Sequence, residues 1–198
     1  KKIVITGALG YIGTELCKLY SGFSWKYDVI ALDNRFISER VNELKRRKIK
    51  FVQADILDLE TIKPYIQQAD YVHHLAGITD VAYVKKDSDK LKDALIEKVA
   101  IEGTGNVLIS MNKNATIIFP STHVVFEGLK KTKYNIIESE KPKTFLAYST
   151  SKVINEKQIK NSKKNYIILR LGSVYGYSDD ATRIDIMPNL FSKIASQN

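Results

Sequence analysis

The sequence has little cysteine and histidine, and it has no long apolar run. Cys17 is the single cysteine in 198 residues, so no disulfide can form within the chain. No apolar run approaches the roughly 18 residues that a membrane-spanning helix needs. The three histidines form no cluster with cysteine or aspartate at metal-ligand spacing, which predicts no metal site. We therefore expect a cytoplasmic protein without a membrane partner, in which Cys17 is a packing residue.

The charge is unbalanced, with 31 lysines and arginines against 22 acidic residues and a net charge of +9. The basic residues are scattered, as at residues 45–48 and 160–164, rather than gathered with aromatic side chains on one face. This pattern is typical of a lysine-rich solvated surface and predicts no nucleic-acid partner. An anionic substrate would be attracted by the same field.

Strand and helix patterns alternate along the chain, which is the sequence form of repeated βαβ units around a parallel sheet. The predicted strands are residues 3–6, 28–32, 49–53, 71–75, 116–120 and 166–171. The predicted helices are residues 11–20, part of 38–47, 59–67, a long helix ending near 111, 147–160 and 187–196. Between residues 127 and 144 the chain is polar and without periodicity, which predicts a long loop of the kind that is often functional.

The alternating pattern changes after residue 171. A turn pattern follows at residues 172–176, and the last predicted helix stops only because the chain stops. Residue Lys1 is also not a methionine. We expect a cofactor-binding domain at residues 1–171 and the start of a second lobe at residues 172–198, within a longer protein.

A glycine-rich turn joins the first predicted strand to the first predicted helix. Gly7, Gly10 and Gly13 have Gly-x-x-Gly-x-x-Gly spacing, and Asp33 ends the next strand about 20 residues on. The glycines permit a tight turn, a close approach of backbone N–H groups to a pyrophosphate, and close packing of the helix. Such a turn can also be a plain strand-to-helix connection. The strand before it, the amphipathic helix after it and Asp33 together favour a dinucleotide site.

A second motif, Tyr148-x-x-x-Lys152, opens the helix after the long loop and places both side chains on one helix face. A tyrosine with a pKa near 10 is a poor base at neutral pH, but a neighbouring ammonium favours the phenolate and lowers that pKa. Lys152 can also reach a ribose hydroxyl. Alone, such a pair is an ordinary surface feature; beside a dinucleotide turn it predicts redox chemistry.

Eight motifs occur in order along the chain: Thr6-Gly7-x-x-Gly10-x-x-Gly13, Asp33, Asp55, His74-Leu75-Ala76-Gly77, Gly103-Thr104-x-Asn106, Ser121-Thr122, Tyr148-x-x-x-Lys152 and Arg170-x-x-x-Val174-Tyr175-Gly176. Together they resemble the extended short-chain dehydrogenase/reductases, and within these the NAD-dependent sugar-nucleotide epimerase/dehydratase group. The resemblance covers nearly the whole chain. It implies an α/β fold, a Rossmann-type doubly wound parallel sheet with helices on both faces, and a C-terminal substrate lobe that is largely absent from these residues.

The resemblance also implies roles for single residues. Cofactor binding is implied for Gly7, Gly10, Tyr11, Ile12, Gly13, Asp33, Asn34, Asp55, Ile56, Leu75, Ala76, Gly77, Tyr148 and Lys152. Catalysis is implied for Thr122, Tyr148 and Lys152, with Thr122 bonded to the reacting oxygen. Asp33 would bind ribose hydroxyls and repel a 2′-phosphate, which favours NAD, whereas the nearby Arg35 keeps NADP possible. The alternative for residues 55–56, 75–77 and 122 is a purely structural place at a strand end.

Departures from the family pattern narrow the reaction. Where the 4,6-dehydratases carry an Asp-Glu pair after the active Ser/Thr, this chain has His123 and Val124, and valine cannot move a proton. Elimination by that route is therefore not expected. His123 is interpreted as a structural histidine, with a substitute acid or base as the alternative. Ser173 stands where relatives often have asparagine; with Thr122 and His123 it completes the candidate substrate contacts.

We predict an NAD(P)-dependent sugar-nucleotide epimerase, in which bound NAD transiently oxidises a sugar hydroxyl and the ketone is then re-reduced. One alternative is an NAD(P)H-dependent reductase of a keto sugar or other carbonyl, and another is a non-catalytic cofactor-binding regulatory protein. The predicted partners are a sugar-nucleotide substrate and a second copy of the chain. Family members often pair through two helices into a four-helix bundle, and the helix ending near 111 and the Tyr148 helix are the candidates.

Overall fold

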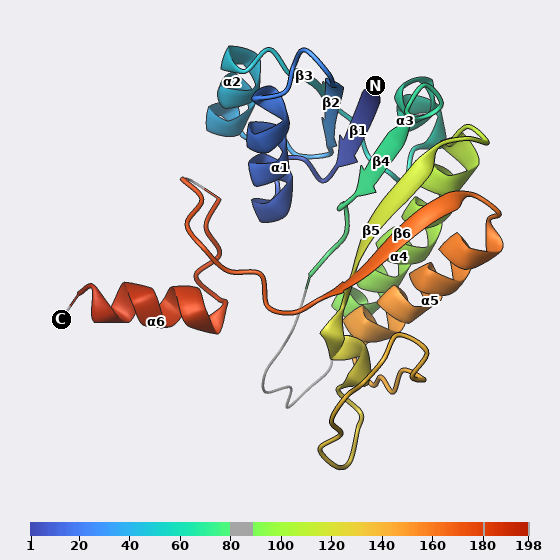
Figure 1. Cartoon of the computed structure of the whole chain (residues 1–198), viewed down its shortest axis with the longest axis vertical. Helices are drawn as coiled ribbons and strands as arrows, with labels where there is room; N and C mark the ends of the chain where they lie inside the picture. Colours follow the sequence, from blue (N-terminus) through green and yellow to red (C-terminus); the bar gives the residue numbers. More distant parts are fainter. Residues whose placement is uncertain (80–88, 180, 198) are drawn as a thin grey trace.

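Six parallel strands form the sheet around which the described chain, residues 1–79, 89–179 and 181–197 of a computed structural model, is arranged. The spatial order is β3-β2-β1-β4-β5-β6 (Figure 1). The strands are β1 (Lys2–Thr6), β2 (Asp28–Asp33), β3 (Lys50–Gln53), β4 (Tyr71–His74), β5 (Thr116–Thr122) and β6 (Asn165–Leu171). The order reverses between β1 and β4, so the sheet is doubly wound and its switch point lies between these two strands.

The helices lie on both faces of the sheet because the crossovers between parallel strands are helical. They are α1 (Tyr11–Ser21), α2 (Ser38–Arg46), α3 (Leu59–Ile66), α4 (Lys90–Ser110), α5 (Ala147–Asn161) and α6 (Met187–Ala195), with a short 3-10 helix η1 (His123–Phe126). The fold class predicted from the sequence is confirmed, and no described helix is long and apolar enough to cross a membrane.

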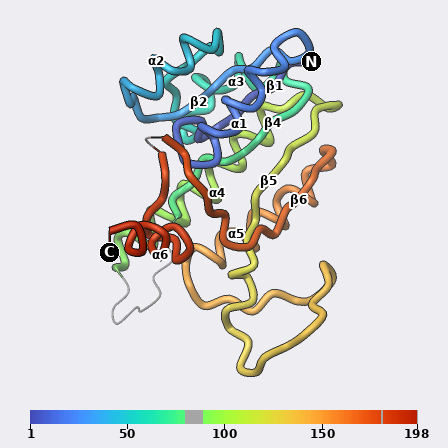
Figure 2. The backbone as a smooth tube through the Cα atoms, turned by 60° about the vertical axis from the view of Figure 1, so that its left-hand side comes forward, coloured from blue at the N-terminus to red at the C-terminus, as the bar shows by residue number. Residues whose placement is uncertain are grey.

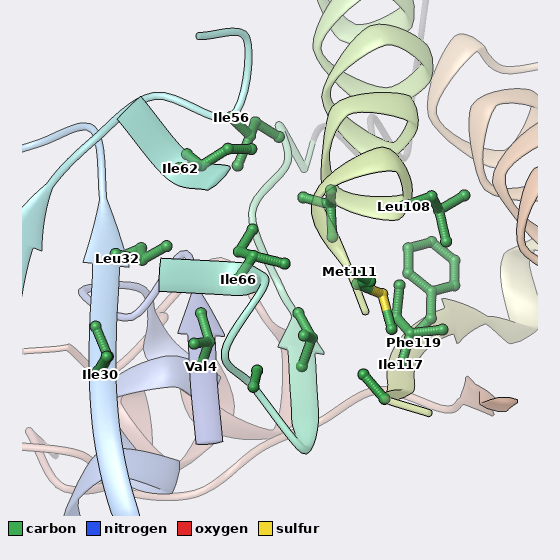
Figure 3. Packing of buried hydrophobic residues seen from close by; sticks show 14 of the residues in the cluster. Val4, Ile30, Leu32, Ile56, Ile62, Ile66, Leu108, Met111, Ile117 and Phe119 are labelled. Carbon is green, nitrogen blue, oxygen red and sulfur yellow. The ribbon is translucent and has the colours of Figure 1, made fainter. Parts of the chain in front are cut away.

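Two apolar cores sandwich the first strands. Ile3 and Ile5 of β1 pack on one face with Cys17 of α1 and Leu44 of α2. Val4, between them, points to the other face, where the side chains of β2, α3, α4 and β5 meet (Figure 3). This alternation follows from the period of two in a strand and explains why β1 reads as an unbroken apolar run. The expected packing role of Cys17 is confirmed, and burial raises its pKa to about 12.

The strands β5 and β6 are covered on one face only. Helices α4 and α5 pack together and cover one face of these strands. Phe119 of β5 points to that face and packs in the same core as Ile159 of α5. Tyr166, Ile167 and Leu169 of β6 remain 45%, 47% and 42% exposed, although they are apolar strand residues. Helix α6 has no buried residue and stands away from the sheet in Figure 1. The last strand and the last helix therefore present apolar surface.

The predicted elements are confirmed, with ends that differ by one or two residues in most cases. Residues 127–144, all described, form the expected long loop without helix or strand. Strand β5 continues two residues beyond its predicted end, and η1 follows it, which the sequence analysis did not predict. The cause is local: the Thr122 hydroxyl accepts a hydrogen bond of 3.1 Å from the Val124 N–H and starts the short helix.

The segment after β6 turns back toward α1, as Figure 2 shows. Tyr11, at the start of α1, donates a hydrogen bond of 2.6 Å to the carbonyl of Gly176. Ser178 donates one of 2.6 Å to Glu15 on the same helix. Residues that are more than 160 positions apart in sequence are thus joined beside the glycine-rich turn.

Candidate active site

The predicted site residues lie at one edge of the sheet, where all six strands end. Gly7 follows β1, Asp33 ends β2, Leu75 follows β4, and Thr122 ends β5. Parallel strands bring their carboxyl ends to the same edge, and ligands of doubly wound sheets bind there, at the switch point. The topology therefore gathers residues that the sequence spreads over more than a hundred positions.

The glycine-rich turn has no room for side chains. Gly7 has φ +68°, and a Cβ there would lie 2.7 Å from the backbone nitrogen of Ala76. A Cβ on Gly13 would lie 2.4 Å from the Gly7 carbonyl oxygen, because α1 begins directly against the turn. These two glycines are required by geometry, since a larger residue would collide with backbone that cannot move away cheaply.

The first turn of α1 fits an anion. Gly10 is its N-cap, no side chain caps the helix, and its first turn contains no acidic residue. The N–H groups at a helix start need acceptors and carry the positive end of the helix dipole. The predicted pyrophosphate residues Gly10, Tyr11 and Ile12 are thus arranged as a phosphate-binding turn requires.

Asp33 is held by several donors at the end of β2. Its carboxylate accepts the Leu9 N–H at 3.0 Å and the Arg35 N–H at 3.0 Å. The Arg35 guanidinium also pairs with it at 3.1 Å and 3.3 Å. Asn34 donates to Asp55 at 3.1 Å, so the candidate adenosine residues form one polar patch. The arginine beside Asp33, noticed in the sequence, contacts the carboxylate directly.

Buried polar side chains are hydrogen-bonded to one another beneath the switch point. His74 Nδ1 lies 2.9 Å from the Thr6 hydroxyl, and its Nε2 lies 3.0 Å from the Thr104 hydroxyl. The Ala76 N–H donates to Thr6 at 3.2 Å. Burial, with the charge of Lys152 as a smaller cause, lowers the pKa of His74 to about 3, so the ring is neutral. These hydrogen bonds join β1, β4 and α4 beneath residues 75–77.

The packed and hydrogen-bonded place expected for His73 and His74 is confirmed. His73 Nε2 lies 2.8 Å from the Tyr20 hydroxyl, and burial lowers the His73 pKa. Thr6 and Thr104 stand in the quoted motifs, but no role was predicted for either. Thr6 meets His74 because β1 pairs with β4 in that register, and Thr104 meets it because α4 packs there; no local sequence pattern reports either contact.

Tyr148 and Lys152 meet the β4 end at a small cavity of about 30 Å³. Its lining comes from three elements and the chain after β4: Leu75, Ala76, Gly77, Ile78, Thr79, Ile96, Ala100, Phe119, Tyr148, Ser151, Lys152 and Asn155. The cavity joins the predicted catalytic helix face to the predicted cofactor run at residues 75–77. These two sets are separated by about 70 residues in the sequence.

The pKa of Tyr148 corrects one expectation. Burial raises it above its ordinary value, while a hydrogen bond with the Thr122 side chain and the charge of Arg183 act in the opposite direction. From the sequence, Lys152 was expected to lower this pKa. In the structure the Lys152 ammonium donates to the Pro120 carbonyl at 2.9 Å and lies 5.8 Å from the Tyr148 ring centroid. Thr122, at the end of β5, lies beside Tyr148, and its bond to a substrate oxygen stays a prediction.

Lys152 itself is perturbed more strongly. Burial lowers its pKa to about 8, and its ammonium lies 4.5 Å from the ring centroid of Phe119. A buried amine with a pKa this close to neutrality is a mark of functional sites. Its charge is desolvated at the place where a bound hydroxyl or phenolate would stabilise it.

The other two residues predicted to contact the substrate, His123 and Ser173, are exposed to solvent. His123 is exposed and its Nδ1 lies 3.1 Å from the Leu171 carbonyl oxygen, a contact that ties η1 to the end of β6. Ser173 is exposed just after β6. Roles in substrate binding stay predictions for both. Within residues 1–79, 89–179 and 181–197, no group of three or more histidine, cysteine or acidic residues could hold a metal ion.

A larger cavity of about 180 Å³ lies between α1 and α2, away from Tyr148. Charged residues around it pair with one another: Lys18 with Asp179 at 3.7 Å, and Arg47 with Glu43 at 2.7 Å. Because these charged side chains are paired with one another, they are less available for catalysis than the side chains around the smaller cavity beside Tyr148.

Comparison with known proteins gives a consistent result. A family model described as the NAD dependent epimerase/dehydratase family matches residues 3–198. UDP-glucose 4-epimerase of Bacillus subtilis (strain 168) is 30% identical over 140 residues, which cover 63% of this chain and 40% of that protein. The chain spans about half the length of the curated relatives it matches.

Solved structures agree with the sequence relatives. A UDP-glucose 4-epimerase of Thermotoga maritima, crystallised with UDP-glucose, has a TM-score of 0.75 and 26% identity, with 91% of this chain and 58% of that chain covered. A UDP-glucuronic acid 4-epimerase of Bacillus cereus, in complex with UDP-glucuronic acid and NAD, has a TM-score of 0.77 and 25% identity, with 99% and 63% covered.

Proposed function

The chain belongs to the NAD-dependent epimerase/dehydratase family, and from this premise we propose that it is the cofactor-binding part of a sugar-nucleotide epimerase. The proposed cofactor is NAD, and the proposed substrate is a sugar linked to a nucleoside diphosphate. The observation that carries the proposal is the meeting of Tyr148 and Lys152 with the chain after β4 around one cavity, beside the switch point.

The cofactor assignment is supported by the fit of the first half of the site. The uncapped first turn of α1 would hold the pyrophosphate, and the polar patch of Asp33, Asn34 and Asp55 would hold the adenosine. Ile56 and the chain at residues 75–77 would line the same path. When bound, NAD supplies a hydride acceptor that can return the hydride to the other face of the sugar.

Three side chains would handle the proton. Tyr148 takes the proton of the sugar hydroxyl. It gives the proton back after the keto sugar has rotated to present its other face to the cofactor. Thr122 aligns the reacting oxygen through its side-chain hydroxyl, beside Tyr148. Lys152 holds a ribose hydroxyl, and its charge favours the phenolate once its hydrogen bond with Pro120 is exchanged for that contact. Because burial raises the Tyr148 pKa, this rearrangement is needed for efficient proton removal.

A reductase of a keto sugar is the second candidate. The position of Arg35 at the end of β2 supports it, because a guanidinium there can receive the 2′-phosphate of NADP once it leaves the Asp33 carboxylate. Tyr148 would then give its proton to the carbonyl oxygen, while Thr122 aligns that oxygen and Lys152 keeps its place at the ribose. The retention of both Tyr148 and Lys152 argues against a non-catalytic regulatory protein.

We also propose that residues 172–198 begin the substrate lobe, and that further chain covers β6. The exposed apolar residues of β6 and the unburied α6 support this division. A homodimer through α4 and α5 is proposed as well, because these helices pack side by side and α4 exposes Leu91 and Leu95.

The experiment is a turnover assay with the full-length protein and a panel of nucleoside-diphosphate sugars. We expect interconversion of two sugar epimers without net consumption of NAD(P)H, and NAD in the mass spectrum of the purified protein. Stoichiometric consumption of NAD(P)H selects the reductase. Tyr148→Phe should bind NAD normally and lose turnover by about 100-fold or more; near-normal turnover would overturn the assignment.

A further inference from the structure

Helix α5, which carries Tyr148 and Lys152 in its first two turns, has no cap of its own. Its N-cap residue is Leu146, whose side chain cannot accept a hydrogen bond, and no acidic residue stands in its first turn. The backbone N–H groups at a helix start need acceptors, and Ser, Thr, Asp or Asn normally supplies them. The acceptor for this helix comes from elsewhere in the fold.

Glu127 supplies it from the beginning of the long loop. One carboxylate oxygen accepts the Leu146 N–H at 2.9 Å and the Phe145 N–H at 3.1 Å. The same oxygen accepts the hydroxyl of Ser149, which is completely buried one turn into the helix. This arrangement corresponds to one half of a capping box, in which an acid accepts the N–H of the N-cap residue, but here the acid stands about 20 positions earlier in the chain.

Glu127 is equally fixed to the turn that carries Thr122. It directly follows η1, and its N–H donates to the Val124 carbonyl at 3.0 Å. The Lys143 N–H donates to Val125 at 2.9 Å, and the Gly128 N–H donates to Lys143 at 2.8 Å, so the two ends of the loop are held together. The carboxylate therefore bridges the end of β5 and the start of α5.

We propose that Glu127 is a positioning residue, whose carboxylate fixes the start of α5 against η1 and so holds Tyr148 in contact with Thr122. The proposal rests on the proposed function, in which this pair handles the sugar oxygen. Hydrogen bonds to an ionised acceptor are stronger than neutral ones, and a negative charge at a helix start is favoured by the helix dipole. A displacement of Tyr148 by even about 1 Å would weaken catalysis by up to about 100-fold.

The test compares four variants of the full-length protein. Glu127→Ala removes the acceptor, Glu127→Asp keeps the charge but shortens the side chain, and Glu127→Gln keeps an acceptor oxygen without the charge. Glu140→Ala is the matched control, because Glu140 stands in the same loop and pairs with Lys133 instead of α5. The readouts are kcat, KM, thermal unfolding and the pH titration of the Tyr148 ring, followed by NMR of tyrosine labelled at Cζ and assigned with Tyr148→Phe.

We expect Glu127→Ala and Glu127→Asp to lower kcat by about 10- to 100-fold with KM changed less than about threefold. The pKa of Tyr148 should rise further, because the interaction with Thr122 that lowers it is weakened. Glu127→Gln should recover most of both losses, and Glu140→Ala should resemble the wild type.

The proposal is overturned if Glu127→Ala and Glu127→Asp leave kcat and the Tyr148 titration unchanged, whatever they do to thermal unfolding. If Glu127→Ala does not fold, the Asp and Gln variants decide by the same two readouts. Failure of the proposed function is a separate result: Tyr148→Phe would then turn over normally, while the NMR titration would still report whether Glu127 positions the ring.

Discussion

The two halves of the sheet are built differently. In the first half, β1 and β2 are buried on both faces, and Ile5 is completely buried. In the second half, β6 has helices on one face only, and Ile167 is 47% exposed. The first half offers a ligand backbone N–H groups beside glycines, whereas the second half offers side chains. Most of the proposed cofactor contacts thus lie in the first half, with Tyr148 and Lys152 added by the second half, which has an uncovered apolar face.

The largest effect should come from the glycine turn of the first half. Gly13→Ala places a Cβ 2.4 Å from a backbone oxygen, so we expect a loss of more than about 4 kcal/mol of stability, or no folded protein. Gly22→Ala, at the other end of α1 with φ −69° and its nearest atom at 3.4 Å, should stay within about 1 kcal/mol of the wild type. Urea unfolding measures both; equal effects would contradict the steric account.

A pair of isoleucines tests the comparison directly. Ile5→Ala should cost about 2–5 kcal/mol, because a completely buried side chain is lost from a closed core. Ile167→Ala should cost more than about 1.5 kcal/mol in the full-length protein, because we propose that further chain covers β6. Urea unfolding of the two variants gives the costs. A cost below about 0.5 kcal/mol for Ile167→Ala would mean that β6 stays exposed in the full-length protein, so that only the first half of the sheet is covered on both faces.

Lys152 should show that the second half gives up stability for function. Burial lowers its pKa from 10.5 to about 8, so between these values the unfolded chain binds more protons and stability rises with pH. Lys152→Met should therefore stabilise the protein at pH 7 by about 1–3 kcal/mol and abolish turnover. Thermal unfolding at pH 7 and pH 9.5 is the measurement, and the variant should lack the rise. A destabilised variant would refute the desolvation argument.

The smallest effect concerns the seam between the halves, where His74 joins β1 to α4. Its pKa falls from 6.5 to about 3 on folding, so the unfolded chain binds the proton first and stability is lost as pH drops below 6.5. At about pH 5.5 this loss should be near 1.4 kcal/mol, and His73 adds to it in the same direction. His74→Gln should show a smaller acid loss in urea unfolding, while exposed His123→Gln should not.

Much of the fold and of the candidate site could be predicted from the sequence. Apolar runs with a period of two and of 3.6 residues placed the strands and helices, because these patterns reflect burial directly. Gly7 and Gly13 could be identified because a dinucleotide turn needs glycine at fixed positions. Asp33 could be identified because an acidic residue follows such a turn about 20 residues later. The protonation behaviour of Tyr148 and Lys152 could not, because both pKa values depend on burial and that of Tyr148 also on Thr122 and Arg183.

The sequence by itself determined the parallel sheet, the glycine turn and the order of the motifs, since each is a local pattern with a local physical cause. Only the tertiary structure decided which distant groups meet: the Thr6 and Thr104 hydroxyls on His74, and the Glu127 carboxylate at the start of α5. Such contacts depend on how helices cross the sheet and where a loop returns. Hydrogen bonding and desolvation act over a few ångströms in space, regardless of separation along the chain.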